Sequence, residues 1–524
     1  MKFPLDHQKT FMLCLLGVAL AQSPLAAQTS TKAPTLGSSE NAKDQIYTLQ
    51  QDQEAQADAR TDFQSETSFP SYLYSTPFYV ERGTAEEREK FKTESIDHNI
   101  EKYLSMEFAA DEETEDKWGG AYWTAGILNY DSPTVRTSIN KAFEQFAQLT
   151  PNFQRIILQS TYTLYPDQYI PEVEASLPFA AQPKAFAIGA YHLLRASPTP
   201  TQRAIISTLL ENRFPETDAP QLIALKEVLK HPLQQEIRSQ PPMIDLLTAP
   251  IVEGKPVIFS LQRLNRNYPG IAIVRGTDGK FLRNTEGGIF HISQHARSRT
   301  DLPGTITYGN SPRGIYSING SGIATNKFIG SVPYLWSRVP VEVNPSDYFF
   351  GEIPEALQPF LVIPEKPEEP LGWSRELYTA LLPNSWKTYR PIYEAWLAGQ
   401  AGRSDMIIHG TTINPDFYKN EIYYPHTPSA GCIGAIEFWS PEDGSLLYSG
   451  QLELLKQFTS TKTDKGFLVV VDLDAKDHPV RLDDVLPMIL EAERLMRENH
   501  SAEDHEEAAE ANSASAPAET MPTQ

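Results

Sequence analysis

The spacing of hydrophobic residues changes near the middle of the chain. Between residues 81 and 245, apolar residues recur at helical spacing, as in Val135 to Leu149 and Pro220 to Leu229, and Pro-containing turns separate these segments. From about Pro256, short apolar runs typical of β-strands alternate with Gly, Pro, Asn and Asp, which favour turns. The pattern predicts an α+β multidomain protein, with an all-helical domain at 81–245 followed by a mostly antiparallel β domain at 250–475.

Two further helical segments are expected within and after the β domain. Residues 344–403 carry Pro clusters and aromatic helical stretches, which indicates a partly helical insertion. After the last β-type run, Leu, Val, Ile and Met recur at helical spacing from Leu482 to Met496. This periodicity predicts a C-terminal helix at 476–498.

The two ends of the chain are expected to lie outside the folded domains. Residues 1–27 combine two lysines, a short apolar run and small residues up to Ala27, which is the layout of a secretory signal peptide. The polar segment at 28–80 predicts a flexible linker, and the Ala-, Glu- and Ser-rich segment at 499–524 predicts a disordered tail. Because no later run approaches the ~18 apolar residues of a membrane span, we expect an exported protein with no transmembrane segment.

The charge of the chain narrows the classes of partner. Its 524 residues carry a net charge of −22, which argues against nucleic acid as a partner. Between residues 255 and 340, however, Lys and Arg outnumber Asp and Glu by 11 to 3, so a basic surface that suits an acidic ligand is expected there. Of the two cysteines, Cys14 falls in the predicted signal peptide, so Cys432 is the thiol expected in the mature chain.

Cys432 and His409 form a candidate nucleophile and base. His409 directly follows the apolar run Met406 to Ile408, so a buried strand would deliver its imidazole at the strand end. A cysteine attacks as the thiolate, and a nearby imidazole both lowers the thiol pKa and carries the proton to a leaving amine. A lone cysteine is more often a small buried hydrophobic residue. Whether Cys432 is a nucleophile therefore has to be judged from the surrounding motif.

Four segments of this region resemble, in order, the motifs of the L,D-transpeptidase family with its YkuD-type catalytic domain. They are Ser-Pro-Arg-Gly-Ile-Tyr-Ser-Ile at 311–318, Val-Pro-Tyr-Leu-Trp at 332–336, His-Gly-Thr at 409–411 and Ser-Ala-Gly-Cys at 429–432. The likeness covers roughly residues 256–474 without the insertion. It implies a YkuD-like β-sandwich or barrel, located in the periplasm or cell envelope, that acts on peptidoglycan stem peptides.

The resemblance also implies a role for each residue of the motif. Cys432 would attack the carbonyl of the third stem-peptide residue and expel the terminal D-amino acid, with His409 as the base. The carbonyl of Gly410 would orient the imidazole, and the backbone N–H groups of Gly431 and Cys432 would hold the oxyanion. Neither a cofactor nor a metal is implied.

Substrate-binding residues are expected on the strand before His409 and on the cysteine loop, at Tyr334, Trp336 and Ser429. The chain departs from the family at Ala430, where His is frequent, and at Gly434, where Arg or Asn is common. Another cation must then recognise a substrate carboxylate. The candidates are arginines of the basic region, namely Arg297, Arg299, Arg313 and Arg338.

Three other histidines are candidates for a chemical role. His426 lies six residues before Cys432 and could compete with His409 as the base, although the neighbouring prolines place it on a loop. His291 and His295 have the i, i+4 spacing of metal ligands. They fall in a β-type region without a nearby acidic partner, which favours ordinary polar roles.

The position of the insertion suggests a cover for the active site. Residues 344–403 interrupt the chain between two strands that the family places at the catalytic cleft, so a lid is expected. Packing of the insertion on a core of its own is the alternative interpretation. The aromatic residues that decide between them are Trp373, Trp386, Tyr389, Tyr393 and Trp396.

Two other functions compete with a transpeptidase. A hydrolase of the same fold would form the same thioester and pass it to water, trimming stem peptides or releasing a wall-linked protein. A wall-binding scaffold would use the helical domain to recruit an envelope protein. The presence of both His409 and Cys432 favours an enzyme.

Overall fold

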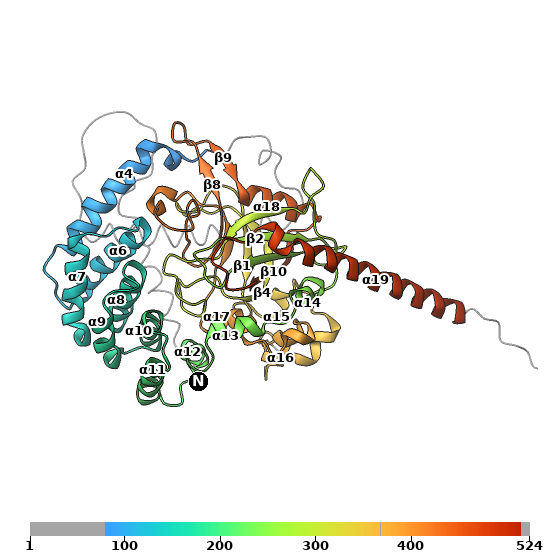
Figure 1. Cartoon of the computed structure of the whole chain (residues 1–524), viewed down its shortest axis with the longest axis horizontal. Helices are drawn as coiled ribbons and strands as arrows, with labels where there is room; N and C mark the ends of the chain where they lie inside the picture. Colours follow the sequence, from blue (N-terminus) through green and yellow to red (C-terminus); the bar gives the residue numbers. More distant parts are fainter. Residues whose placement is uncertain (1–78, 367, 515–524) are drawn as a thin grey trace, which may run out of the picture.

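The computed structural model describes residues 79–366 and 368–514 and has an α+β architecture (Figure 1). A helical region precedes a closed eight-stranded β-barrel, and a long C-terminal helix projects from the barrel. The predicted signal peptide at 1–27 lies outside the described residues, as does the predicted linker at 28–80 apart from its last two residues. Among the described helices, none is both long enough and apolar enough to cross a bilayer.

Proline and hydroxyl residues determine where many helices of the helical region begin. Five of the longer helices carry proline in the first turn, where its missing N–H costs no hydrogen bond. The side chains of Ser132, Thr150 and Thr199 accept hydrogen bonds from N–H groups of the turns that follow them. The helices are α4 (Ala85–Ser95), α5 (Lys102–Leu104), α6 (Glu112–Leu128), α7 (Pro133–Glu144), α8 (Pro151–Leu164), α9 (Ile170–Ser176), α10 (Pro183–Ala196), α11 (Pro200–Arg213), α12 (Pro220–Lys230) and α13 (Leu233–Glu236).

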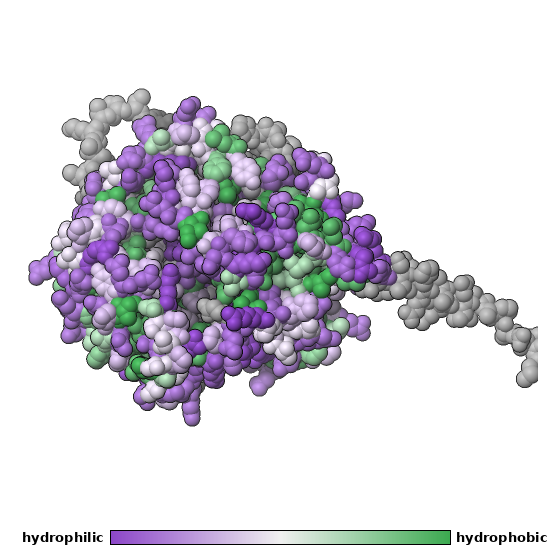
Figure 2. Space-filling view, viewed as in Figure 1, coloured by the Kyte–Doolittle hydropathy of each residue, from purple (hydrophilic) through white to green (hydrophobic). Residues whose placement is uncertain are grey.

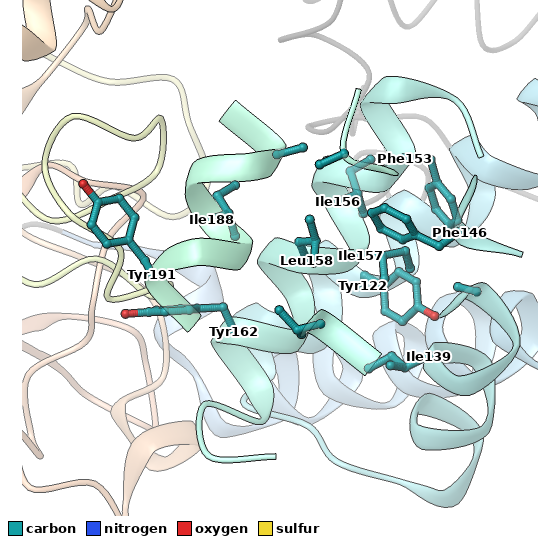
Figure 3. Packing of buried hydrophobic residues seen from close by; sticks show 14 of the residues in the cluster. Tyr122, Ile139, Phe146, Phe153, Ile156, Ile157, Leu158, Tyr162, Ile188 and Tyr191 are labelled. Atoms are coloured by element: carbon teal, nitrogen blue, oxygen red, sulfur yellow. The ribbon is translucent and has the colours of Figure 1, made fainter. Parts of the chain in front are cut away.

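Helices α8 and α10 lie at the centre of the helical core. Phe153 and Leu158 of α8 and Ile188 of α10 are buried in one cluster (Figure 3). Tyr162, also on α8, belongs to the same cluster, and its hydroxyl donates to the Asp301 carbonyl in the loop after β3 at 3.4 Å. Hydrophilic side chains predominate on the face of the molecule in Figure 2, as expected for helices that bury one side.

The strands of the barrel follow the order β1-β10-β4-β5-β6-β7-β3-β2. Two neighbouring pairs, β1 with β10 and β6 with β7, are parallel, and the other pairs are antiparallel. Of the predicted mostly antiparallel β-sandwich or barrel, the structure has a closed barrel, which is mixed; the antiparallel sandwich is wrong. Its strands are β1 (Val257–Gln262), β2 (Gly270–Arg275), β3 (His291–His295), β4 (Gly314–Gly322), β5 (Tyr334–Arg338), β6 (Ile407–His409), β7 (Ile433–Ala435) and β10 (Lys465–Asp472).

Alternate residues of the strands face two different hydrophobic clusters. Residues from all eight strands, among them Ile258, Leu335 and Ile408, share one cluster and therefore point into the barrel. Helix α18 (Gly450–Thr459) adds Leu454 and Phe458 to this interior cluster. A separate hairpin of β8 (Glu437–Trp439) and β9 (Leu446–Ser449) precedes α18.

The outward face of β1, β2, β4 and β10 is covered by the insertion and by helices α14 (Met243–Thr248) and α19 (Leu482–Ala514). Tyr378 and Trp396 of the insertion pack there with Phe467 of β10. The lid prediction is wrong for the insertion's aromatic residues, because they belong to this core. Its elements are α15 (Pro345–Tyr348), η7 (Glu355–Phe360), α16 (Arg375–Ala380), η8 (Asn384–Trp386), η9 (Arg390–Tyr393) and α17 (Glu394–Gln400).

The C-terminal helix α19 is longer than predicted. It begins at Leu482, within the predicted 476–498 segment, and continues to Ala514. The helix thus extends into the segment predicted as a disordered tail (499–524) as far as Ala514, and residues 515–524 lie outside the described part. Ala and Glu dominate the added segment, and both residues have high helix propensity.

The helical region contacts two loops of the barrel, the one between β3 and β4 and the one between β6 and β7. Lys184 donates to the Thr307 hydroxyl at 2.8 Å, and the Tyr418 hydroxyl donates to the carbonyl of Ile127 at 2.8 Å. The second of these loops carries the predicted cysteine motif. The helical region is thus packed beside the part of the barrel that holds the candidate chemistry.

Candidate active site

Cys432 and His409 lie on the same outward face of neighbouring strands. In the parallel pair β6–β7, Ile408 is the partner of Ile433, and His409 is the partner of Gly434. Both isoleucines point into the barrel. Because side chains alternate along a strand, His409 and Cys432 point outward, diagonally across the two strands.

The next strand places two predicted substrate residues on the same face. Trp336 of β5 is the partner of Ile407 on β6, so it faces outward in the row of Cys432. Tyr334, two residues earlier, lies in the row of His409 and is buried. The structure therefore brings together the two catalytic candidates and two of the predicted substrate residues, Tyr334 and Trp336.

His409 is held in one tautomer by its neighbour in sequence. Its Nδ1–H donates to the carbonyl oxygen of Gly410 at 2.6 Å, which leaves the Nε2 lone pair as the proton acceptor. The imidazole is buried, and this burial lowers its pKa, while the hydrogen bond to Gly410 acts in the opposite direction. His409 is therefore neutral at neutral pH and able to accept a proton.

The Cys432 thiol is protonated in the resting structure. Burial raises its pKa, and the backbone N–H of Ile407 and the charge of Arg403 partly oppose this shift. Within the described residues, no hydrogen bond joins Cys432 to His409. Thiol and imidazole start as a neutral pair, and proton transfer requires them to come within hydrogen-bond reach when a substrate binds.

The loop before Cys432 is fixed by its own side chains. The Ser429 hydroxyl donates to the Cys432 carbonyl at 2.6 Å and accepts from the Gly431 N–H at 2.9 Å. Ser429 thus acts on the loop itself rather than facing a ligand. Because the Gly431 N–H is engaged, the Cys432 N–H is the better candidate for an oxyanion donor. Gly431 has φ +120°, a conformation that favours glycine.

Arg403, at the end of the insertion, is a cation of the site that the sequence did not reveal. It is buried, and its guanidinium donates to the carbonyl oxygens of Gly309, Asn310 and Gly431 at 3.2, 2.8 and 3.5 Å. Its charge favours the thiolate of Cys432. Arg403 therefore holds the cysteine loop through its hydrogen bonds, and its charge reduces the rise in the thiol pKa that burial causes.

Glu437 of β8 is a second residue that the sequence did not reveal. A Cβ at position 410 would lie 1.9 Å from the Glu437 Cδ, so the carboxyl occupies the space that a side chain there would need. The Ser449 hydroxyl donates to Oε1 at 2.7 Å, whereas Oε2 is buried without a partner among the described residues. Burial raises the pKa of Glu437 to about 8, so it is mostly protonated at neutral pH beside the residue that holds His409.

Three of the four candidate arginines are occupied by the protein itself. Arg313 is paired with Glu394 at 2.7 Å and with Asp472 at 3.4 Å. Arg338 pairs with Glu342 and stacks over the Trp336 ring, and Arg297 lies over the Tyr423 ring, 3.8 Å from Asp301. These contacts do not favour substrate binding by these three arginines. Arg299 has no ion pair among the described residues and lies over the ring of Trp123, 4.0 Å from its centroid.

The other candidate histidines lie on β3 and on the loop before β7. His426 is hydrogen-bonded through Nε2 to the Ser293 hydroxyl at 2.8 Å, and burial lowers its pKa to about 3. His295 donates from Nε2 to the Arg266 carbonyl at 2.8 Å. His291 is exposed at the start of β3. His295 is the partner of Gly434 on β7, which is in turn the partner of His409, so His295 faces outward in the row of His409, one strand beyond β7. Its ring centroid lies 5.2 Å from that of His426, and both rings are held by the hydrogen bonds given above rather than by Cys432.

Comparisons of the chain with protein-family models, with curated proteins and with solved structures find no match. The functional argument therefore rests on the residues and geometry of the site.

Proposed function

We propose that the protein is a cell-envelope L,D-transpeptidase that acts on peptidoglycan stem peptides through a thioester on Cys432. The main support is the shared outward face of Cys432 and His409, together with the hydrogen bond from His409 to Gly410 that leaves Nε2 as an acceptor. The motif resemblance supplies the substrate class. The predicted signal peptide supports an envelope location.

The reaction follows from the groups on this face. His409 Nε2 takes the thiol proton as the Cys432 sulfur attacks the carbonyl carbon of the third stem residue. The developing oxyanion accepts from the Cys432 N–H. The C–N bond to the terminal D-amino acid then breaks, and His409 returns the proton to the leaving amine. An amine of a second stem attacks the thioester, forms the new amide and releases the thiol.

Arg403 and Glu437 support this chemistry without touching the reacting atoms. Arg403 opposes the effect of burial on the thiol pKa, so a larger fraction of Cys432 can ionise at neutral pH. The neutral Glu437 carboxyl packs on Gly410 and helps to fix the carbonyl that orients His409. Both residues act as positioning residues.

Product analysis tests the acceptor. We expect the full chain, incubated with disaccharide tetrapeptides, to release the terminal D-amino acid and to form a cross-linked dimer. The Cys432→Ser variant should form neither product, because a hydroxyl lacks the thiolate character that His409 can generate. Tripeptides without dimers would support the hydrolase alternative. Unchanged tetrapeptides that bind the chain would support the scaffold alternative, in which the helical region recruits an envelope protein.

A further inference from the structure

A small open pocket lies between the helical region and the loop that follows β3. Helices α6 and α8 contribute Trp123, Arg155 and Gln159 to its lining, and the loop contributes Arg299 and Tyr308. None of the residues that line the pocket is an aspartate or a glutamate. Two arginines therefore give this pocket a positive charge in a chain whose net charge is −22.

Polar groups on three residues of the pocket, Arg299, Trp123 and Arg155, are hydrogen-bond donors suited to an anion. Arg299 lies over the Trp123 ring and has no ion pair among the described residues. The indole N–H of Trp123 is buried and has no hydrogen-bond partner in the described part of the chain. Arg155 donates to the side-chain oxygens of Asn152 and Gln159, which are amides rather than carboxylates. A buried donor without an acceptor is costly unless a ligand supplies one.

The pocket is connected to the cysteine loop through the backbone. The backbone N–H of Arg299 donates to the Ser429 carbonyl at 2.9 Å, and Ser298 and Ser429 are paired in an isolated parallel β-bridge. The Ser429 hydroxyl in turn donates to the carbonyl of Cys432. A ligand held by Arg299 would thus be bound by the segment that is paired with the nucleophile's own loop.

We propose that this pocket binds a carboxylate of an acidic peptide, with the Arg299 guanidinium and the Trp123 indole N–H as donors. A carboxylate accepts both donors at once, and the aromatic rings of Trp123 and Tyr308, 4.9 Å apart, form an apolar wall beside it. That the peptide is a peptidoglycan stem rests on the proposed function. The helical region would then form part of the substrate site and supply the carboxylate recognition that Gly434 lacks.

Isothermal titration of the full chain carrying Cys432→Ala tests this proposal without turnover. The probe is the tetrapeptide L-Ala-γ-D-Glu-diaminopimelate-D-Ala, compared with the same peptide in which the glutamate and diaminopimelate side carboxylates are amidated. We expect Arg299→Gln to weaken binding of the acidic peptide about ten- to hundredfold and to affect the amidated peptide little. Arg203→Gln, on α11 outside the pocket, is the matched control and should leave both affinities unchanged.

A second variant keeps the test valid if Arg299→Gln does not fold. Trp123→Phe preserves the ring but removes the indole N–H, and it should weaken binding of the acidic peptide several-fold. Equal affinity of the acidic and amidated peptides, or no effect of either variant, would overturn the proposal. Equal binding of free D-glutamate would also overturn it in favour of a small-carboxylate site. Acylation of unmodified Cys432 by a carbapenem, measured separately, reports on the proposed function alone.

Discussion

Replacing Glu437 by glutamine should stabilise the barrel at neutral and alkaline pH and change its stability little below pH 5. The carboxyl is buried, its Oε2 has no partner in the described structure, and burial raises its pKa from 4.5 to about 8. In the unfolded chain the carboxyl ionises near its ordinary pKa, whereas in the folded chain it keeps its proton up to about pH 8. Between these values the folded state binds more protons, so the stability falls as the pH rises.

The size of the effect follows from the shift in pKa. Each pKa unit corresponds to about 1.4 kcal/mol, so ionisation of Glu437 costs the folded state about 3 kcal/mol at pH 7 and about 4 to 5 kcal/mol above pH 8. Glutamine has the same shape, keeps an oxygen for the Ser449 hydroxyl and does not ionise. The advantage of the variant should therefore appear with rising pH and level off above pH 8.

Hydrogen exchange of the native protein measures this advantage locally. Amides of β6 and β8 should be protected equally in the wild type and Glu437→Gln at pH 5, and more strongly in the variant at pH 7 to 9. Comparison at the same pH cancels the intrinsic pH dependence of exchange. The control is Glu453→Gln, an exposed residue of α18. A difference in amide protection between wild type and variant that stays constant from pH 5 to pH 9 would refute the reasoning, because it would mean that the pKa of Glu437 is not raised in the folded protein.

Two further predictions concern the reactivity of Cys432 toward a carbapenem. His409→Ala should slow acylation about 10²- to 10⁴-fold at neutral pH and recover partly at alkaline pH, where the thiol ionises without a base. His426→Ala should slow acylation far less. If the His426 variant instead shows the larger loss and the alkaline recovery, the base is misassigned. Arg403→Gln should raise the thiol pKa and move the pH profile of acylation to higher pH, with Arg403→Lys partly restoring it, and profiles that coincide would contradict a role for this charge.

The neighbouring positions of His409 and Cys432 could be predicted because their signals are local. An apolar run that ends in His-Gly, and small residues around a cysteine, indicate a strand end and a tight loop without knowledge of the fold. The expected start of the β-type runs, at about Pro256, is also close to the start of β1 at Val257, and the predicted end of the β domain at residue 475 is close to the end of β10 at Asp472. The two parallel pairs could not be predicted, because they depend on which distant strands become neighbours.

The other site residues depend on contacts between distant parts of the chain. Arg403 is held near Cys432 by hydrogen bonds to carbonyl groups of a loop about a hundred residues earlier, and no short motif records such a contact. Glu437 belongs to the separate β8–β9 hairpin, and its side chain packs against Gly410. The sequence did contain an indication that the insertion packs on the barrel. Strand β10 is a continuous apolar run, which indicates that both of its faces are buried. One face lies in the barrel interior, and the aromatic residues of the insertion pack on the other.

The central claim is that Cys432 is a nucleophile activated by His409, and intact-protein mass spectrometry with a carbapenem tests it most directly. The wild-type chain should gain the mass of one carbapenem, and peptide mapping should place it on Cys432. The Cys432→Ser variant should remain unmodified under the same conditions. An equal adduct on the variant, or no adduct on the wild type, would contradict the account.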